Sequence, residues 1–230
     1  MSAVLIGYSA CELTRAAFEA HGHTVYTCDL LPARGAQSKH FQDDIWNVLA
    51  IGKAWDFAVL HPMCTYLTCS AAWAFGDADF EKYPGVGYHQ KVKPGTLTGE
   101  ARREARREAL DNFARLLALP FPVAVENPGV SFASKAIRPP SQIVQPNQFG
   151  DDASKATGFW LSDGVPLLVP TTYCEPRIVD GKKRWANQTD TGQNRLSPSD
   201  DRWLKRSETY PGIAAAMGDQ WGRWLNNRTV

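Results

Sequence analysis

The fold is decided by residues 3–29, which read AVLIGYSACELTRAAFEAHGHTVYTCD. A short apolar run from Ala3 to Ile6 predicts a buried strand, and apolar residues recur at helical spacing from Glu12 to Ala20. Gly22 ends this helix, and Val25 to Cys28 predicts a second strand. A strand, a helix and a strand in this order are typical of a βαβ unit with parallel strands.

The same alternation continues along the chain. Further strands are predicted at Phe57 to Leu60, Val123 to Val125, Gln142 to Gln145 and Phe159 to Leu161. Leu13, Ala16, Ala17 and Ala20 lie on one face of the first helix, which is predicted to be buried. Other helices are predicted from Thr98 onward and from Gly212 to about Trp224. We therefore expect an α/β, Rossmann-like fold with a mostly parallel sheet and helices on both faces.

Composition limits the class of protein. Apolar residues make up 43% and charged residues 21% of the 230 residues, which is typical of one globular domain. The sequence shows neither an apolar run long enough for a membrane span nor a signal-peptide pattern, so we expect a cytoplasmic protein without a membrane partner. The five cysteines include no C-x-x-C pair, so we expect neither a metal site nor a disulfide framework.

Charge and chain organisation add two expectations. The net charge of +1 counts against an enzyme that holds duplex DNA through many phosphate contacts. Residues 1–230 are expected to form a single domain, in which the Pro-rich residues 137–200 form a small irregular insertion. Residues 74–99 are rich in Gly, Tyr and Pro and predict a long loop, typical of a lid or binding segment.

Polar residues follow the predicted strands at the edge where open α/β sheets bind ligands. After the first strand, residues 7–12 form a turn with one glycine that leads into a helix; it suits either a ligand-binding loop or a structural turn. Asp29 follows the second strand, where an acidic residue commonly accepts hydrogen bonds from a ribose; a helix cap is the alternative.

The next two strand ends carry candidate chemistry. Cys64 lies on the loop after Leu60, where a thiolate could act as a nucleophile, although a buried inert cysteine is the commoner case. Glu126 follows Val125, and a carboxyl that burial keeps protonated could donate to a ring nitrogen. Such a pair supports thiolate addition to carbon 6 of cytosine, protonation of nitrogen 3, methylation of carbon 5, and expulsion of the cysteine.

The order of these motifs resembles that of the cytosine-5 methyltransferases. In chain order they are the turn at Gly7, Asp29, Pro62-x-Cys64, Glu126-Asn127-Pro128 and Gln193-x-Arg195. The likeness spans residues 3–135 and resumes from about 188 to 222. More narrowly, HPMCTYLT at 61–68 and TYPGIA at 209–214 resemble short methyltransferase-like proteins encoded by bacteriophages.

This resemblance implies an S-adenosylmethionine-dependent methyltransferase fold and activity, with cytosine in DNA or a free cytosine nucleotide as substrate. It implies Cys64 as the nucleophile, Glu126 as the proton donor, and Arg195 as a contact to the base or the nucleophile loop. The cofactor would lie along Gly7, Ser9, Glu12, Asp29, Leu30, Asp44 and Pro62, with Asp44 near the adenine amine.

The chain departs from the family pattern in places. The first loop lacks paired glycines, Thr65 replaces the glutamine after the cysteine, and Pro128 stands where valine is common. Residues 137–200 are also too few for the sizeable target-recognition module of the family. Two alternatives stay open: a binding module of phage origin that has lost the reaction, and a methyltransferase acting on an amino group, which would want an Asp/Asn-Pro-Pro-aromatic loop.

Overall fold

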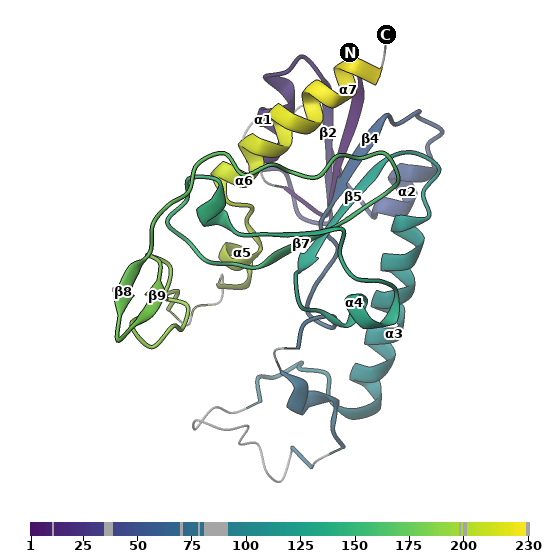
Figure 1. Cartoon of the computed structure of the whole chain (residues 1–230). Coiled ribbons are helices and arrows are strands. Elements are labelled where there is room, and N and C mark those ends of the chain that lie inside the picture. The colour runs from purple at the N-terminus through teal and green to yellow at the C-terminus, as the bar shows by residue number, and fades with distance from the viewer. Residues whose placement is uncertain are drawn as a thin grey trace.

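A computed structural model describes residues 1–10, 12–34, 39–69, 71–77, 79–80, 92–197, 199 and 202–228, so part of the predicted loop at 74–99 lies outside the described residues. The large sheet has the strand order β3-β2-β1-β4-β5-β7-β6, and β8 and β9 form a second, two-stranded sheet (Figure 1). All strands of the large sheet run in one direction except β7, which is antiparallel to both of its neighbours. The predicted α/β class and mostly parallel sheet are confirmed.

The strands are β1 (Ala3–Gly7), β2 (Thr24–Asp29), β3 (His40–Gln42), β4 (Phe57–Leu60), β5 (Val123–Pro128), β6 (Gln142–Val144), β7 (Thr157–Leu161), β8 (Arg177–Val179) and β9 (Lys182–Arg184). The helices are α1 (Glu12–Glu19), α2 (Ile45–Ala50), α3 (Gly99–Leu117), α4 (Phe132–Ala136), α5 (Arg202–Ser207), α6 (Pro211–Ala216) and α7 (Gly222–Arg228). The short helical turns are η1 (Ala72–Phe75), η2 (Pro146–Gln148) and η3 (Met217–Trp221).

The boundaries of the predicted insertion need correction. β6 and β7 lie within residues 137–200, yet both pair into the large sheet and complete it. What leaves the sheet is therefore the chain after β7, which includes the β8–β9 hairpin that projects to one side in Figure 1.

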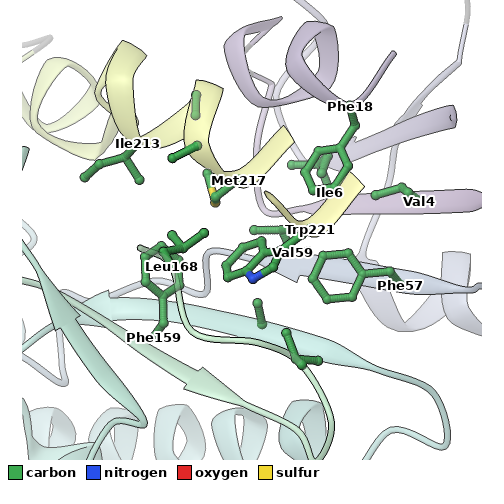
Figure 2. Close-up of a cluster of buried hydrophobic side chains, with 14 of the residues drawn as sticks. Val4, Ile6, Phe18, Phe57, Val59, Phe159, Leu168, Ile213, Met217 and Trp221 are labelled. Atoms are coloured by element: carbon green, nitrogen blue, oxygen red, sulfur yellow. The ribbon is translucent and has the colours of Figure 1, made fainter. Parts of the chain in front are cut away.

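Helices cover both faces of the sheet, and each face has its own core (Figure 1). Side chains alternate along β1, so Val4 and Ile6 join the core under α1, α6 and η3, whereas Leu5 joins the core under α2 and α3. Figure 2 shows the first core, in which Trp221 packs edge-on against Phe57 at a centroid distance of 5.5 Å.

The predicted buried face of α1 is wrong. Thr14 and Phe18 are buried, whereas Leu13 is 41% exposed. The buried face of α1 is set by its contact with η3. The two elements lie so close that a Cβ on Gly218 would be 2.5 Å from the backbone of Ala17. Glycine at this position lets α1 and η3 approach closely, and their contact turns Phe18 toward the sheet.

The arginines of α3 divide into two sets. Arg103 and Arg107 form ion pairs with Glu100, as a solvated face predicts. Arg102 and Arg106 instead turn inward, and their guanidinium carbons lie 4.8 and 3.3 Å from the ring centroid of Phe75. Among the described residues, no helix combines the length and apolar character needed to cross a membrane.

Candidate functional site

Strand register brings the candidate residues to one edge of the sheet. Gly7 at the end of β1 is in register with Leu60 of β4, and Leu60 is in register with Val125 of β5. His61 and Glu126 therefore follow at neighbouring positions beyond this row. This is the carboxyl edge of the parallel strands, where ligands bind in open α/β sheets.

His61 and Glu126 form a pair at this edge. His61 Nδ1 lies 3.2 Å from Glu126 Oε2, and the two side chains are 10% and 18% exposed. The backbone amide of His61 donates to the Gly7 carbonyl at 3.0 Å, which ties the pair to β1. The sequence showed His61 only as the end of a strand; its position one residue after β4 was the signal that could have identified it.

Contacts with neighbouring groups decide the charge of Glu126. Burial acts to raise the pKa of this carboxyl, whereas the hydrogen bond with His61 and the positive charge of Lys155 act to lower it. The lowering prevails, so Glu126 is ionised at neutral pH in the ligand-free protein. Burial alone therefore does not keep this carboxyl protonated in the free protein, and a role as proton donor requires that Glu126 first take up a proton.

Cys64 reaches the surface on the loop that follows His61. The pKa of its thiol is raised, first because the surrounding protein removes part of its hydration and second because the negative charge of Glu126 lies nearby. The positive charges of Lys155 and Arg206 act in the opposite direction. The carboxylate of Glu126 thus acts electrostatically on the Cys64 thiol, and the resting thiol is protonated at neutral pH.

The loop is held on both sides of Cys64. Before it, the Pro62 carbonyl accepts a buried hydrogen bond of 3.0 Å from Asn127 Nδ2. After it, the Thr65 carbonyl accepts a hydrogen bond of 3.2 Å from Arg102 Nη2. Arg102 is only 5% exposed, so α3 fixes this loop from inside the protein.

The residues assigned to the cofactor lie at or after the ends of β1, β2, β3 and β4. Ser9 donates its amide to the Cys28 carbonyl at 3.0 Å, and Glu12 begins α1 with an exposed side chain. Asp29 is partly buried at the end of β2, and the Leu30 side chain beside it is 71% exposed. A carboxylate next to an exposed apolar side chain fits the ribose and the adenine of a nucleoside cofactor.

Three of the assigned residues have a structural role. A Cβ on Gly7 would lie within 2.7 Å of side-chain atoms of Leu60 and Ile45, so packing alone requires glycine there. Asp44 is the N-cap of α2, and its Oδ1 accepts the helix amide of residue 46 at 2.8 Å. Pro62 is buried and contributes its carbonyl to the loop contact described above.

Arg195 lies in another place. Its Nε donates to the Gln188 carbonyl at 2.8 Å. A surface depression of about 920 Å³ is lined by Thr189, Asp190, Gln193, Asn194, Arg195, Leu196, Ser197, Arg202 and Arg206. The cations whose charges act on Cys64 are Lys155 and Arg206, so Arg206 rather than Arg195 connects this depression with the thiol.

A small cavity of about 10 Å³ adjoins the His61–Glu126 pair. It is lined by His61, Glu126, Lys155, Thr157, Phe159, Ser207, Thr209, Tyr210 and Ile213. This volume holds about one water molecule. Lys155 Nζ donates to the carbonyls of Arg206 and Glu208, at 3.0 and 3.3 Å, and so draws the segment before α6 against this edge. Lys155 was missed because nothing in its sequence context marks it.

Within the described part of the chain, no group of three or more His, Cys, Asp or Glu side chains could hold a metal ion. Comparison of the chain with models of protein families and with curated protein sequences gave no match.

Proposed function

We propose that the chain transfers a methyl group from S-adenosylmethionine to carbon 5 of a cytosine, in DNA or in a free cytosine nucleotide. One observation carries the proposal: a thiol and a carboxylate from different strand ends meet at the carboxyl edge of a parallel sheet, close enough for their charges to interact. The seven-stranded, mostly parallel sheet agrees with the Rossmann-like methyltransferase fold that the resemblance implies.

Carbon 5 of cytosine is a poor nucleophile until carbon 6 is substituted. The Cys64 thiol first loses its proton to solvent, and Glu126 first takes up a proton. The thiolate then forms a bond to carbon 6 while Glu126 gives its proton to nitrogen 3, and the resulting enamine makes carbon 5 nucleophilic. Bound S-adenosylmethionine supplies an electrophilic methyl group. After carbon 5 has taken the methyl group, a base removes the carbon 5 proton, the bond to Cys64 breaks, and nitrogen 3 returns its proton to Glu126.

The residues at the ends of β1 and β2 would hold the cofactor. Asp29 would accept hydrogen bonds from the ribose hydroxyls, and Leu30 would cover the adenine. Ser9 and Glu12 border the turn between β1 and α1, where the amino acid part of the cofactor would bind. Asp44 would lie near the adenine amine while it caps α2.

The surface depression favours a polynucleotide substrate over a free nucleotide. Arg195, Arg202 and Arg206 line it, and arginine side chains bind phosphate groups well. The segment 177–206 carries eight basic and four acidic residues, in a chain whose net charge is only +1. Because the charge of Arg206 also acts on Cys64, a strand in the depression would pass the nucleophile.

Product analysis tests the proposal. Purified protein is incubated with methyl-deuterated S-adenosylmethionine and duplex DNA, single-stranded DNA or a cytosine nucleotide, and the nucleosides are examined by mass spectrometry. We expect labelled 5-methylcytosine, no product with Cys64→Ser, and turnover at least ~100-fold lower with Glu126→Gln. Label on an amino nitrogen, or methyl transfer that survives Cys64→Ser, would contradict the proposal.

The small cavity favours a second candidate, a binding module that kept the fold and lost the reaction. A volume of about 10 Å³ beside Glu126 is far too small for a nucleobase, and the glycine of the first loop is explained by packing. Isothermal titration separates the two functions. A protein that binds nucleic acid but does not bind S-adenosylmethionine would be a binding module and not a methyltransferase.

A further inference from the structure

The His61–Glu126 pair is held in place by four strands. His61 follows β4 and donates its amide to Gly7 of β1, and Glu126 is a member of β5 in register with Phe159 of β7. The contact of 3.2 Å between Nδ1 and Oε2 joins two side chains that are 90% and 82% buried. A pair placed in this way can exchange a proton without movement of the backbone.

The second ring nitrogen of His61 has no partner. His61 Nε2 is buried, and no hydrogen bond to it is found within the described residues. Leaving a buried polar atom unsatisfied costs free energy, so such an atom calls for an explanation. His61 also lines the cavity of about 10 Å³, which has room for about one water molecule.

Glu126 needs a source for the proton that the proposed reaction takes from it. The carboxyl is ionised in the free protein, so it must receive a proton before it can protonate a ring nitrogen. Four other groups face it or share its cavity. The positive charge of Lys155 acts on Glu126, and the negative charge of Glu126 acts on Cys64. Tyr210 lines the same cavity, and His61 forms a hydrogen bond with Glu126.

We infer that His61 and Glu126 act as one proton-holding pair, in which His61 supplies the proton that Glu126 gives to nitrogen 3 of the cytosine. This inference rests on the proposed function. The Nδ1 proton of the imidazolium moves to Glu126 Oε2, which neutralises both groups. Glu126 then passes this proton to nitrogen 3 as the bond between the Cys64 thiolate and carbon 6 forms, and the neutral His61 keeps its proton at Nε2, where a water in the cavity would accept a hydrogen bond. The steps reverse when the cysteine leaves, so His61 is a positioning and relay residue that acts through Glu126.

Three variants test the relay. His61→Asn retains an amide that can donate near the position of Nδ1 but cannot pass on a proton. We expect at least ~100-fold slower methyl transfer and a pH–rate profile that differs from that of the wild type. His61→Ala should regain rate when imidazole is added. The matched control is His21→Asn, which alters a surface histidine 3.6 Å from Asp219 and should keep the full rate.

A second readout needs no methyl transfer. Ligand-free protein with ¹³C-labelled glutamate is titrated with pH and followed by NMR. The signal of Glu126 is the one that is absent from the spectrum of Glu126→Gln. In His61→Leu the pKa of Glu126 should rise, because burial then acts without the hydrogen bond from His61.

The outcomes separate the two proposals. A His61→Asn enzyme with the wild-type rate and pH profile overturns the relay and leaves methyl transfer intact, as would be found if Cys64 itself supplied the proton. An unchanged Glu126 titration in His61→Leu also overturns the relay. A wild-type protein without methyl transfer, in which the Glu126 titration still depends on His61, supports the pair and overturns the proposed function.

Discussion

The charge of Glu126 acts on Cys64. The negative carboxylate raises the pKa of the thiol, in addition to the effect of lost hydration, while Lys155 and Arg206 partly offset this. In the free protein Cys64 is therefore held as a thiol. A substrate that neutralises the negative charge of Glu126 would lower the pKa of Cys64, so formation of the thiolate is coupled to protonation of the carboxyl.

This coupling predicts the behaviour of the thiol without any substrate. Replacing Glu126 by Gln removes a nearby negative charge, which lowers the pKa of Cys64 and increases its thiolate fraction at pH 7.5. We expect iodoacetamide to alkylate Cys64 several-fold faster in Glu126→Gln than in the wild type, measured by peptide mass spectrometry. The exposed Cys69 serves as an internal control whose rate should not change. Equal rates at Cys64 in both proteins would show that the two groups are not coupled.

At the residue scale, the sequence indicated two candidate site residues but not the side chains that hold them in place. Cys64 and Glu126 could be predicted because each follows an apolar run that ends at a polar motif. Asn127 and Lys155 could not, because their roles are hydrogen bonds to carbonyl groups of distant segments. Such contacts depend on the tertiary fold and leave no local pattern in the sequence.

At the scale of elements, α3 supports the loop that carries Cys64. Arg102 reaches from the buried side of the helix to the carbonyls of Thr65 and Leu97, at 3.2 and 3.3 Å, and lies over the rings of Tyr66 and Phe75. The guanidinium thus joins the loop after β4 to the segment before α3. The predicted solvated helix face is correct only for the arginines that point outward.

The Arg102 anchor can be removed with little change in side-chain length. Arg102→Met should lower the free energy of unfolding by about 1–3 kcal/mol, because buried carbonyls lose their donors. Amide hydrogen exchange at Leu67 and Thr68 should accelerate. The control is Arg107→Met in the same helix, which removes an exposed ion-pairing side chain and should change stability by less than about 0.5 kcal/mol. Similar exchange in both variants would contradict the anchoring role.

The elements that the sequence predicts well are those with strong apolar runs. β1, β2, β4 and β5 occur where apolar stretches end at polar motifs, whereas β3 is three residues long and was missed. α2 was missed with it, since its six residues are too few for a helical period. The face of α1 was wrong because the close approach of η3, rather than the largest count of apolar residues, decides which side is buried.

At the scale of the whole molecule, two separate cores flank one sheet. The core under α2 and α3 contains Cys28, and Tyr8 packs against it from the turn after β1. Burial raises the pKa values of both residues to about 12. In an unfolded chain these groups ionise near about 8.5 and about 10. Their neutral forms are therefore favoured in the folded state.

This difference predicts loss of stability in alkali. Each contribution is fully present below the unfolded pKa and is lost as the pH rises from that value toward about 12. We expect the free energy of unfolding in urea to fall between pH 9 and pH 12, and to fall less steeply in Cys28→Ala. Cys69→Ala removes an exposed thiol and should leave the slope unchanged. An equal slope in Cys28→Ala and the wild type would rule out this contribution.

The region after β7 shows where prediction from sequence stops. The sequence predicted it as an irregular insertion and assigned Arg195 to the catalytic centre, but the structure places Arg195 in the depression beside the β8–β9 hairpin. The path of the chain after β7 depends on single contacts, such as the hydrogen bonds from Arg177 to the carbonyls of Trp185 and Gln188, and not on a repeating sequence pattern. The hydrophobic periodicity of the sequence therefore predicts the sheet and its carboxyl edge. Tertiary contacts decide the structure of the chain after β7.

A bond between Cys64 and carbon 6 of a cytosine would be trapped by a fluorinated substrate. An oligonucleotide containing 5-fluorocytosine is incubated with S-adenosylmethionine and the protein, and the intact mass is recorded. Fluorine replaces the carbon 5 hydrogen that must be removed as a proton before the cysteine leaves, so the bond to the cysteine persists. We expect a covalent complex with the wild type and with Cys69→Ser, and none with Cys64→Ser. A complex that forms with Cys64→Ser, or a wild type that binds both partners and forms none, would contradict this expectation.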